Sequence, residues 1–464
     1  MEDLPWQGDA CALVDTFRSG ARTPAEELTS VLAALERSPL NSFSHVDAEQ
    51  AIETARHADV SLPFGGVPVG VKELQDVAGW PATSASFPLR ERRAVVDSTL
   101  VRRVRDAGSV LVGLTTASEF GGVNLTRTVL NGVTRNPWDH KRTPGGSSGG
   151  AAASVAGGLV TIATAGDAGG STRIPAGFCG MFGLKGTYGR IPRGPRAEWF
   201  SFTGVSGCVS RSVRDTARFL DVTNGFDPRD PHSLPRVDGY ERGLGVHIDE
   251  IRGLRVAVMM DFGGAFVAPL VAQQVAMLAD ELISALDFVR VDAVATLPNM
   301  GAAWSLAGML GIRANLGDAW PDCADDLTPE MRFGLRWLDG KWDDNAAIRV
   351  AKRRVEHNEA MAALFAQTDF VITATNPDVA FAAEGPLPTV FGGREVGGWN
   401  NGRLTAPSNL YGNPAVSIPA GTVAGLPVGL QVLAGHHRDH WLLDIAHVAE
   451  RLQPWPLVAP TTHR

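Results

Sequence analysis

Two glycine clusters, each carrying serine, constrain this chain more than any other feature. They are GGSSGG at 145–150 and GDAGGS at 166–171. Glycine lets the backbone adopt positive φ and approach another group closely. The residues between the clusters, 151–165, read as a small-residue helix followed by a short β-branched strand typical of a protein interior. Because a flexible linker does not join elements this apolar, the pattern predicts a built site where main-chain N–H groups and hydroxyls converge.

Two other interpretations of these glycines fail. A phosphate-binding loop would place a lysine after the glycines or open a helix with G-x-G-x-x-G, and neither pattern is present. A transmembrane span would need about 20 apolar residues, and the stretch 151–165 is shorter than that.

The second cluster suggests a serine nucleophile. Ser171 follows two glycines in a turn whose N–H groups can face a developing oxyanion. Such a serine needs a base, and none of the 11 histidines lies between Lys141 and Lys185. Lys72 is an alternative base because it ends the apolar, strand-like run GVPVGVK at 66–72. Burial lowers a lysine pKa and frees the neutral amine to accept a proton.

Most of the chain resembles the amidase signature family, whose members hydrolyse amides through a Ser–cis-Ser–Lys triad. The matching segments are GVPVGVKEL (66–74), GVTRNPWD (132–139), TPGGSSGG (143–150), GDAGGSTRIPAGFCG (166–180), LTAPSNLYGNPAVSIPAG (404–421) and GLPVGLQV (425–432). The resemblance implies an α/β fold in which helices cover both faces of a mixed central β-sheet. It also implies that catalysis needs no metal and no organic cofactor.

The resemblance assigns roles to individual residues. Lys72 is the expected base, Ser147 is the bridging serine after a cis peptide bond, and Ser171 is the nucleophile. The expected oxyanion hole consists of the N–H groups of Ala168, Gly169, Gly170 and Ser171. Asp167 and Arg173 flank this turn, and we expect them to pair and brace it rather than take part in the chemistry.

We also expect six residues to contact substrate. The loop 117–131 lines the acyl pocket in the family, and the stretches 298–345 and 384–402 are rich in tryptophan and in glycine respectively. Glycine-rich stretches in compact enzymes are often mobile binding loops. The predicted contacts are Phe120, Gly121, Gly122, Asn124, Trp304 and Trp399.

The expected reaction is hydrolysis of a C–N bond through an acyl-enzyme on Ser171. Bulky or aromatic amides and anilides are the expected substrates, with esters and carbamates as further candidates, since some family members are urethanases. The alternative is the glutamine-hydrolysing subunit of a tRNA-dependent amidotransferase. In that subfamily Arg-Gln-Pro is usual where this chain has Arg173-Ile174-Pro175, which favours the first interpretation. A binding protein without activity is disfavoured because all three triad residues are present.

Composition limits the class of protein and the compartment in which this chemistry is expected. The 464 residues are 44% hydrophobic and 20% charged, as in soluble globular proteins. A net charge of −8 without Lys/Arg runs argues against a nucleic-acid surface. Four scattered cysteines and an acidic start without a signal-peptide pattern indicate a cytoplasmic protein. We therefore expect a small-molecule amide or carbamate as partner, no nucleic acid, no membrane, and a monomer or homodimer.

We expect one domain over 1–464. Its parts would be N-terminal helices (1–65), a catalytic core (66–250), a variable substrate-side region (251–370) and the C-terminal part of the core (371–464). Periodicity and capping residues predict helices at 24–37, 48–58, 98–107 (with Asp97 as N-cap), 268–286, 346–366 and 441–453, and strands at 254–260 and 370–374.

Overall fold

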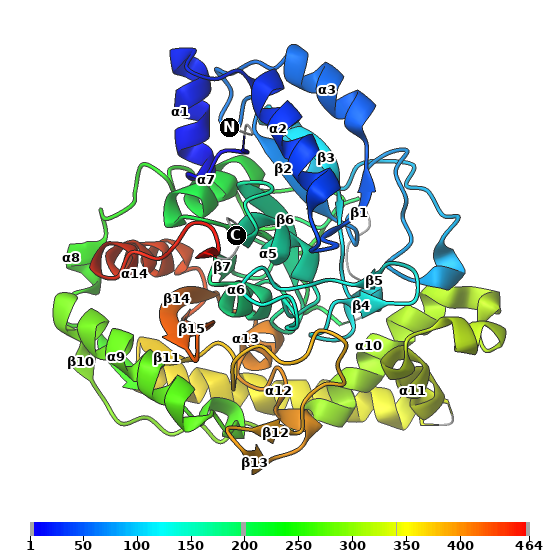
Figure 1. Cartoon of the computed structure of the whole chain (residues 1–464). Helices are drawn as coiled ribbons and strands as arrows, with labels where there is room; N and C mark the ends of the chain where they lie inside the picture. The colour runs from blue at the N-terminus through cyan, green and yellow to red at the C-terminus, as the bar shows by residue number, and fades with distance from the viewer. Residues whose placement is uncertain (1–3, 196–200, 340, 461–464) are drawn as a thin grey trace.

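An eleven-stranded mixed sheet forms the centre of the computed structural model, which describes residues 4–195, 201–339 and 341–460. The strand order is β1-β3-β2-β6-β8-β7-β14-β15-β11-β9-β10. Figure 1 shows the sheet with helices around it. The pairs β2–β3, β2–β6, β9–β11 and β9–β10 are parallel, whereas the other neighbours are antiparallel. The strands are β1 (Phe43–Val46), β2 (Pro68–Lys72), β3 (Val110–Thr115), β6 (Ile162–Asp167), β7 (Phe182–Lys185), β8 (Val205–Ser210), β9 (Arg255–Val258), β10 (Val289–Arg290), β11 (Phe370–Ala374), β14 (Ala415–Val423) and β15 (Leu426–Ala434).

Helices cover both faces of this sheet, as expected. One face packs against α2 (Pro24–Arg37), α3 (Ala48–Arg56), α5 (Gly149–Ala156) and α6 (Arg173–Cys179). The other packs against α1 (Ala10–Ser19), α4 (Thr99–Asp106), α7 (Val213–Thr223), α9 (Pro269–Ala285) and α14 (Asp439–Leu452). Each face has its own apolar core because the strands between them are buried on both sides. No helix among the described residues is long and apolar enough to cross a membrane.

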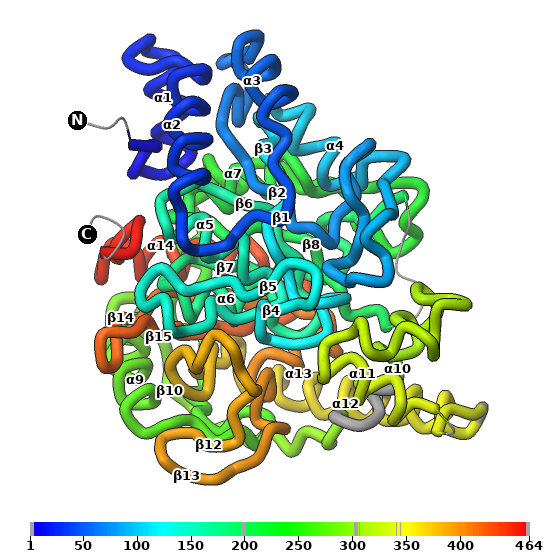
Figure 2. Tube along the Cα trace, turned by 45° about the vertical axis from the view of Figure 1, so that its right-hand side comes forward, coloured from blue at the N-terminus to red at the C-terminus, as the bar shows by residue number. Residues whose placement is uncertain are grey.

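The tryptophan-rich stretch forms a helical lobe at one end of the molecule. Its helices are α10 (Gly301–Leu316), α11 (Pro329–Leu338) and α12 (Asp344–Gln367), and Figure 2 shows α10 and α11 beside the main body. A separate apolar cluster, which includes Leu327 and Met331, holds α10 and α11 together. The remaining helices are α8 (Ile248–Ile251) and α13 (Ala406–Tyr411), and the remaining strands form the small pairs β4 (Arg127–Thr128) with β5 (Gly132–Val133) and β12 (Val390–Phe391) with β13 (Arg394–Glu395).

Local sequence signals set several helix starts. Thr23 and Glu26 form the capping box that begins α2. The prediction that Asp97 caps α4 is wrong, because the Ser98 hydroxyl accepts the N–H of Val101. Asp97 instead accepts the N–H of Ala78 at 2.8 Å and pairs with Arg105. Asp97 therefore ties α4 to the preceding loop, and its neighbour takes the cap.

Helix α5 lies unusually close to the sheet. All eight of its residues are buried, and all are Gly, Ala, Ser or Val. A Cβ added to Gly150 would lie 2.4 Å from the main-chain nitrogen of Thr116 and 2.6 Å from the carbonyl oxygen of Ser42. Main-chain atoms of β3 and its neighbours cannot move aside as a side chain would. Glycine at 150 is thus required by the approach of α5 to the sheet.

Gly150→Ala should destabilise the fold, because the added methyl group overpacks a rigid contact at a cost of about 1–3 kcal/mol or more. Gly308→Ala is the matched control. It also lies within a helix, but nothing is within 4 Å of the added Cβ. There the change should be neutral or should stabilise by up to about 1 kcal/mol. Chemical denaturation of both variants tests this, and equal stability of the two would contradict the packing argument.

Candidate active site

The predicted base meets both serines of the first glycine cluster. The Lys72 ammonium lies 2.8 Å from the Ser147 hydroxyl and 2.7 Å from the Ser148 hydroxyl, and 3.3 Å from the carbonyl oxygen of Gly166. The peptide bond between Gly146 and Ser147 is cis. Lys72 is only 3% exposed. The structure thus brings together the two segments that the sequence predicts to cooperate.

Strand geometry explains why these segments meet. Lys72 ends β2 and Asp167 ends β6, and these two strands are parallel neighbours. Parallel strands bring their carboxyl ends to one edge of the sheet, where α/β proteins place their ligands. The Ser148 N–H donates to the carbonyl of Ser171 at 3.2 Å and links the two glycine clusters directly.

Burial gives Lys72 the protonation behaviour of a base. It lowers the pKa of this amine from 10.5 to about 7, although the carboxylates of Asp167 and Glu73 oppose the shift. At and above neutral pH a large share of Lys72 is therefore the neutral amine, which can accept a proton from the Ser147 hydroxyl.

Ser171 lies half-buried at the end of the second glycine cluster. Within the described part of the chain its hydroxyl has no hydrogen-bond partner, so it is free to meet a substrate carbonyl. The proton transfer from Ser171 to Ser147 consequently belongs to the proposed mechanism below, while the contact between Lys72 and Ser147 is observed.

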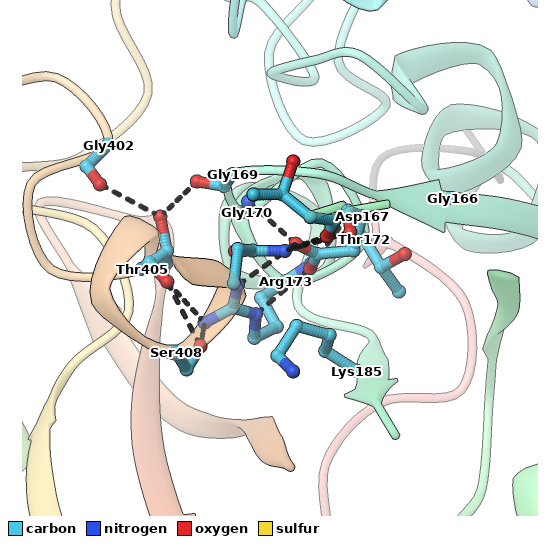
Figure 3. Close-up of polar contacts among 12 residues, drawn as sticks. Gly166, Asp167, Gly169, Gly170, Thr172, Arg173, Lys185, Gly402, Thr405 and Ser408 are labelled. Carbon is cyan, nitrogen blue, oxygen red and sulfur yellow. Dashed lines mark hydrogen bonds and ion pairs between the residues drawn. The ribbon is translucent and has the colours of Figure 1, made fainter. Parts of the chain in front are cut away.

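A buried ion pair shapes the turn before Ser171, as Figure 3 shows. Asp167 and Arg173 lie 2.9 Å apart, and their side chains are at most 1% exposed. The Asp167 carboxylate also accepts the N–H groups of Gly170, Thr172 and Arg173. Burial alone would raise the pKa of Asp167, but the Arg173 guanidinium and these hydrogen bonds hold it well below its usual range. The expected pairing is present, and the carboxylate organises the whole turn.

The same contacts divide the four N–H groups predicted to form the oxyanion hole into one that already donates a hydrogen bond and three that do not. The N–H of Gly170 donates to Asp167 at 2.7 Å and is already used. The N–H groups of Ala168, Gly169 and Ser171 have no hydrogen-bond partner among the described residues. The last three are therefore the groups that this geometry leaves for a developing oxyanion.

Only some of the predicted substrate contacts lie close to the site. A Cβ on Gly121 would lie 3.3 Å from the Ser147 hydroxyl, so the loop carrying Phe120, Gly121 and Gly122 borders the site. Phe120 and Met331 link this loop to the helical lobe, since Phe120 packs on the lobe's apolar cluster and Met331 faces Gly122. Trp399 is 55% exposed, and the side chain of Trp304 lies outside the described residues.

A cavity of about 190 Å³ lies between Phe178 of α6 and the segment 377–401, and none of Lys72, Ser147 and Ser171 lines it. Asn124 lines it, and a Cβ on Gly146 would lie 2.9 Å from the main-chain carbon of Asn124. Most of its other lining is apolar, and Arg142 and Asp378 supply one charge of each sign. The apolar part includes Phe178, Phe381 and Phe391.

Sequence reasoning missed the polar residues that support the turn from a distance. Arg173 also donates to the Ser408 hydroxyl, the Asn409 side chain and the Gln431 side chain. The Thr405 hydroxyl donates to the carbonyl of Gly169 at 2.6 Å. All four lie in the segments 404–421 and 425–432, whose polar residues within apolar runs were the available signal.

The pKa of Lys72 predicts the pH dependence of the reaction. Because only the neutral amine can act as base, kcat/KM should fall as pH drops below about 7 and level off above it. Lys72→Ala should lose roughly 10²–10⁴-fold in rate and with it this titration. A pH–rate profile with a chromogenic ester checks the prediction, and a wild-type profile that is flat from pH 5 to 9 would contradict it.

Asp167→Asn should strongly destabilise the protein, because Arg173 would remain buried without its counter-ion, at a cost of about 3–5 kcal/mol. Asp280→Asn removes one partner of the exposed pair Asp280–Arg290 and should cost less than about 1 kcal/mol. Since folding depresses the pKa of Asp167, the stabilisation from this carboxylate is complete above its ordinary pKa of about 3.9 and is lost as pH falls below it. Urea denaturation of both variants at pH 7 measures the difference.

Comparison with known proteins places this geometry in a family. The amidase family model matches residues 27–443. Two curated relatives are A subunits of glutamyl-tRNA(Gln) amidotransferase. The one from Methanococcoides burtonii is 31% identical over 95% of this chain and 96% of that protein. The one from Pseudomonas fluorescens is 33% identical over 94% of this chain and 96% of that protein.

Solved structures with the same fold include several enzymes. A bacterial aryl acylamidase of the amidase signature family superposes with a TM-score of 0.89 at 26% identity, over 98% of each chain. A 6-aminohexanoate cyclic dimer hydrolase gives 0.87 at 28% identity, over 99% of each chain. The A subunit of the Thermotoga maritima glutamyl-tRNA(Gln) amidotransferase gives 0.76 at 26% identity, over 95% of this chain and 94% of that one.

The names of the relatives correct one expectation. The sequence suggested a monomer or homodimer whose only partner is a small-molecule substrate, without a connection to nucleic acid. The curated relatives are by name subunits of an enzyme that acts on a glutamyl-tRNA, and this overturns that expectation. Neither these relatives nor the solved structures named above support a special closeness to urethanases.

The matched family model, the similarity over nearly the whole chain and the shared fold lead to one conclusion. This chain belongs to the amidase signature family.

Proposed function

We propose that this chain cleaves carboxamide C–N bonds through an acyl-enzyme on Ser171. The observation that carries the proposal is the 2.8 Å contact between the buried Lys72 amine and the Ser147 hydroxyl, beside a turn whose N–H groups at 168, 169 and 171 lack partners among the described residues. Neutral Lys72 accepts the proton of Ser147, and Ser147 accepts that of Ser171. The Ser171 oxygen bonds to the carbonyl carbon, whose π electrons move to its oxygen.

The second half of the reaction reverses this relay. The C–N bond breaks as the proton from the Lys72–Ser147 relay reaches the leaving nitrogen, so that an amine or ammonia departs. Water then attacks the acyl carbon, gives its proton to the same relay, and releases the carboxylic acid and free Ser171. The proton taken from Ser171 leaves with the nitrogen, and the proton taken from water restores the Ser171 hydroxyl, so the protons balance over the cycle.

The first candidate for the amide is glutamine, hydrolysed by this chain in the role of the A subunit of an amidotransferase. The curated relatives support it, since their similarity extends over nearly their whole length. The cavity that Asn124 lines also carries Arg142 and Asp378, whose carboxylate accepts the main-chain N–H groups of Val379 and Gly392. These opposite charges suit the carboxylate and ammonium groups of a free amino acid.

The second candidate is a bulky or aromatic amide or anilide, with carbamates and esters as related substrates. One structural neighbour, which superposes with a TM-score of 0.89, is by name an aryl acylamidase, and this supports the second candidate. Three phenylalanines line the cavity, and Ile174 occupies the position usual for glutamine in amidotransferase subunits.

A covalent probe tests the reaction class. A fluorophosphonate should add mass to the peptide that contains Ser171, and Ser171→Ala should abolish both labelling and turnover. Lys72→Ala should slow labelling while leaving Ser171 in place. Labelling at another residue, or turnover that persists in Ser171→Ala, would refute the acyl-enzyme.

The two substrate candidates are separated by products and by one variant. The assay compares kcat/KM for glutamine, a 4-nitroanilide and an aryl carbamate. The glutamine assay is repeated with amidotransferase partner subunits present. Asp378→Asn should raise KM for glutamine at least about tenfold, by loss of a charge-assisted contact, and change KM for the anilide little. Cleavage of the anilide alone would exclude the glutamine candidate.

A further inference from the structure

The peptide plane between Gly169 and Gly170 is held from both sides. Its carbonyl accepts the Thr405 hydroxyl at 2.6 Å, and its N–H donates to the Asp167 carboxylate at 2.7 Å (Figure 3). A peptide unit is planar, so two opposed hydrogen bonds fix its orientation. Gly170 has a φ of +126°, and a Cβ there would lie 2.3 Å from the Thr405 hydroxyl. Only glycine allows the hydroxyl to come this close.

Thr405 is itself held in place by the ion pair. Its carbonyl accepts Arg173 at 3.0 Å and the Ser408 hydroxyl at 3.0 Å. The contacts therefore form a closed ring that runs from Asp167 to Arg173, then to Thr405, to the peptide 169–170, and back to Asp167. Thr405 is the member that brings α13 and the C-terminal segment into this ring.

The peptide plane controls its two neighbours. The N–H of Gly169 precedes it and the N–H of Ser171 follows it, and both lack hydrogen-bond partners among the described residues. The carbonyl of Gly170 accepts the N–H of Ile174 at 2.7 Å, which fixes the second neighbour from the helix α6. The first neighbour has no comparable support in the described part of the chain, so its direction depends on the plane that Thr405 holds.

We infer that Thr405 is a positioning residue for the oxyanion hole, which it aligns through its hydroxyl contact with the carbonyl of Gly169. The inference rests on the proposed acyl-enzyme at Ser171 and adds to it. The Thr405 hydroxyl also lies 3.1 Å from the carbonyl oxygen of Gly402, but its contact with the carbonyl oxygen of Gly169 is shorter. Thr405 does not touch the reacting atoms; it acts on the transition state by fixing the direction of the Gly169 N–H.

Thr405→Val removes the hydroxyl and keeps the shape of the side chain. With 4-nitrophenyl butyrate as probe, kcat should fall roughly 10- to 100-fold, because a misaligned donor weakens transition-state binding. KM should change less than about threefold, since ground-state binding does not use the oxyanion hole. Thr405→Ser restores the hydroxyl and should remain within about threefold of the wild type. Binding of an aryl trifluoromethyl ketone, whose adduct with Ser171 carries an oxyanion, should weaken in proportion to kcat/KM.

Thr368→Val is the matched control, because Thr368 is also buried and also donates to main-chain carbonyls, those of Arg255 and Phe370. It should keep wild-type kcat. If Thr405→Val is insoluble, Thr405→Ala takes its place in the same comparison. Wild-type kcat without the hydroxyl, an equal loss in Thr405→Ser, or an equal loss in Thr368→Val would each overturn the inference. If Ser171→Ala loses turnover but Thr405→Val keeps full activity, only the positioning role is refuted. If Ser171→Ala remains active, the proposed function is refuted.

Discussion

The ion pair between Asp167 and Arg173 is the interaction on which the rest of the site depends. Burying two charges is costly unless every polar atom finds a partner. Here the guanidinium reaches Asp167, Thr405, Ser408, Asn409 and Gln431, and it thereby joins β6, α6, α13 and β15. The carboxylate uses its remaining capacity on main-chain N–H groups of the turn. The pair converts a glycine-rich segment, which would otherwise be flexible, into one fixed conformation.

The buried lysine is a second constraint, of opposite electrostatic character. Asp167 keeps its charge because it has a full counter-ion, whereas Lys72 faces two neutral hydroxyls and one carbonyl at close range. Burial therefore lowers the pKa of Lys72, whereas the Arg173 guanidinium and the hydrogen bonds keep Asp167 ionised although burial alone would raise its pKa. The contrast arises from the contacts alone, since both residues end neighbouring parallel strands. An ionised Asp167, which braces the turn, and a neutral Lys72, which can act as base, can thus lie close together in one site.

Local chemistry and motif spacing were sufficient to predict much of this arrangement. The helix 24–37 and the strand 370–374 have the predicted bounds, because the capping box and an apolar β-branched run determine them locally. The cap of α4 could not be predicted as surely, since Asp97 and Ser98 both offer an acceptor and the tertiary contact of Asp97 with Ala78 decided between them. Thr405 lies 236 residues from its partner Gly169, and no local pattern reveals such a contact. The partners of the chain were mispredicted because net charge describes a surface only on average.

The separation between chemistry and substrate choice explains why relatives with such different names share this fold. The groups proposed to act on the carbonyl are main-chain N–H groups, two serines and a lysine, held by contacts that no substrate side chain needs to touch. We expect substrate choice to depend on other parts, namely the cavity lined by Phe178, Arg142 and Asp378, and the loop at 120–122 that packs on the helical lobe. Ile174 lies between the turn and the residues that line the cavity. Its side chain lies 2.7 Å from the Cβ position of Gly170 and packs with Phe178 and Ala380. A change at residue 174 therefore alters the packing of Phe178 and Ala380, which line the cavity, without removing a member of the polar ring around Asp167.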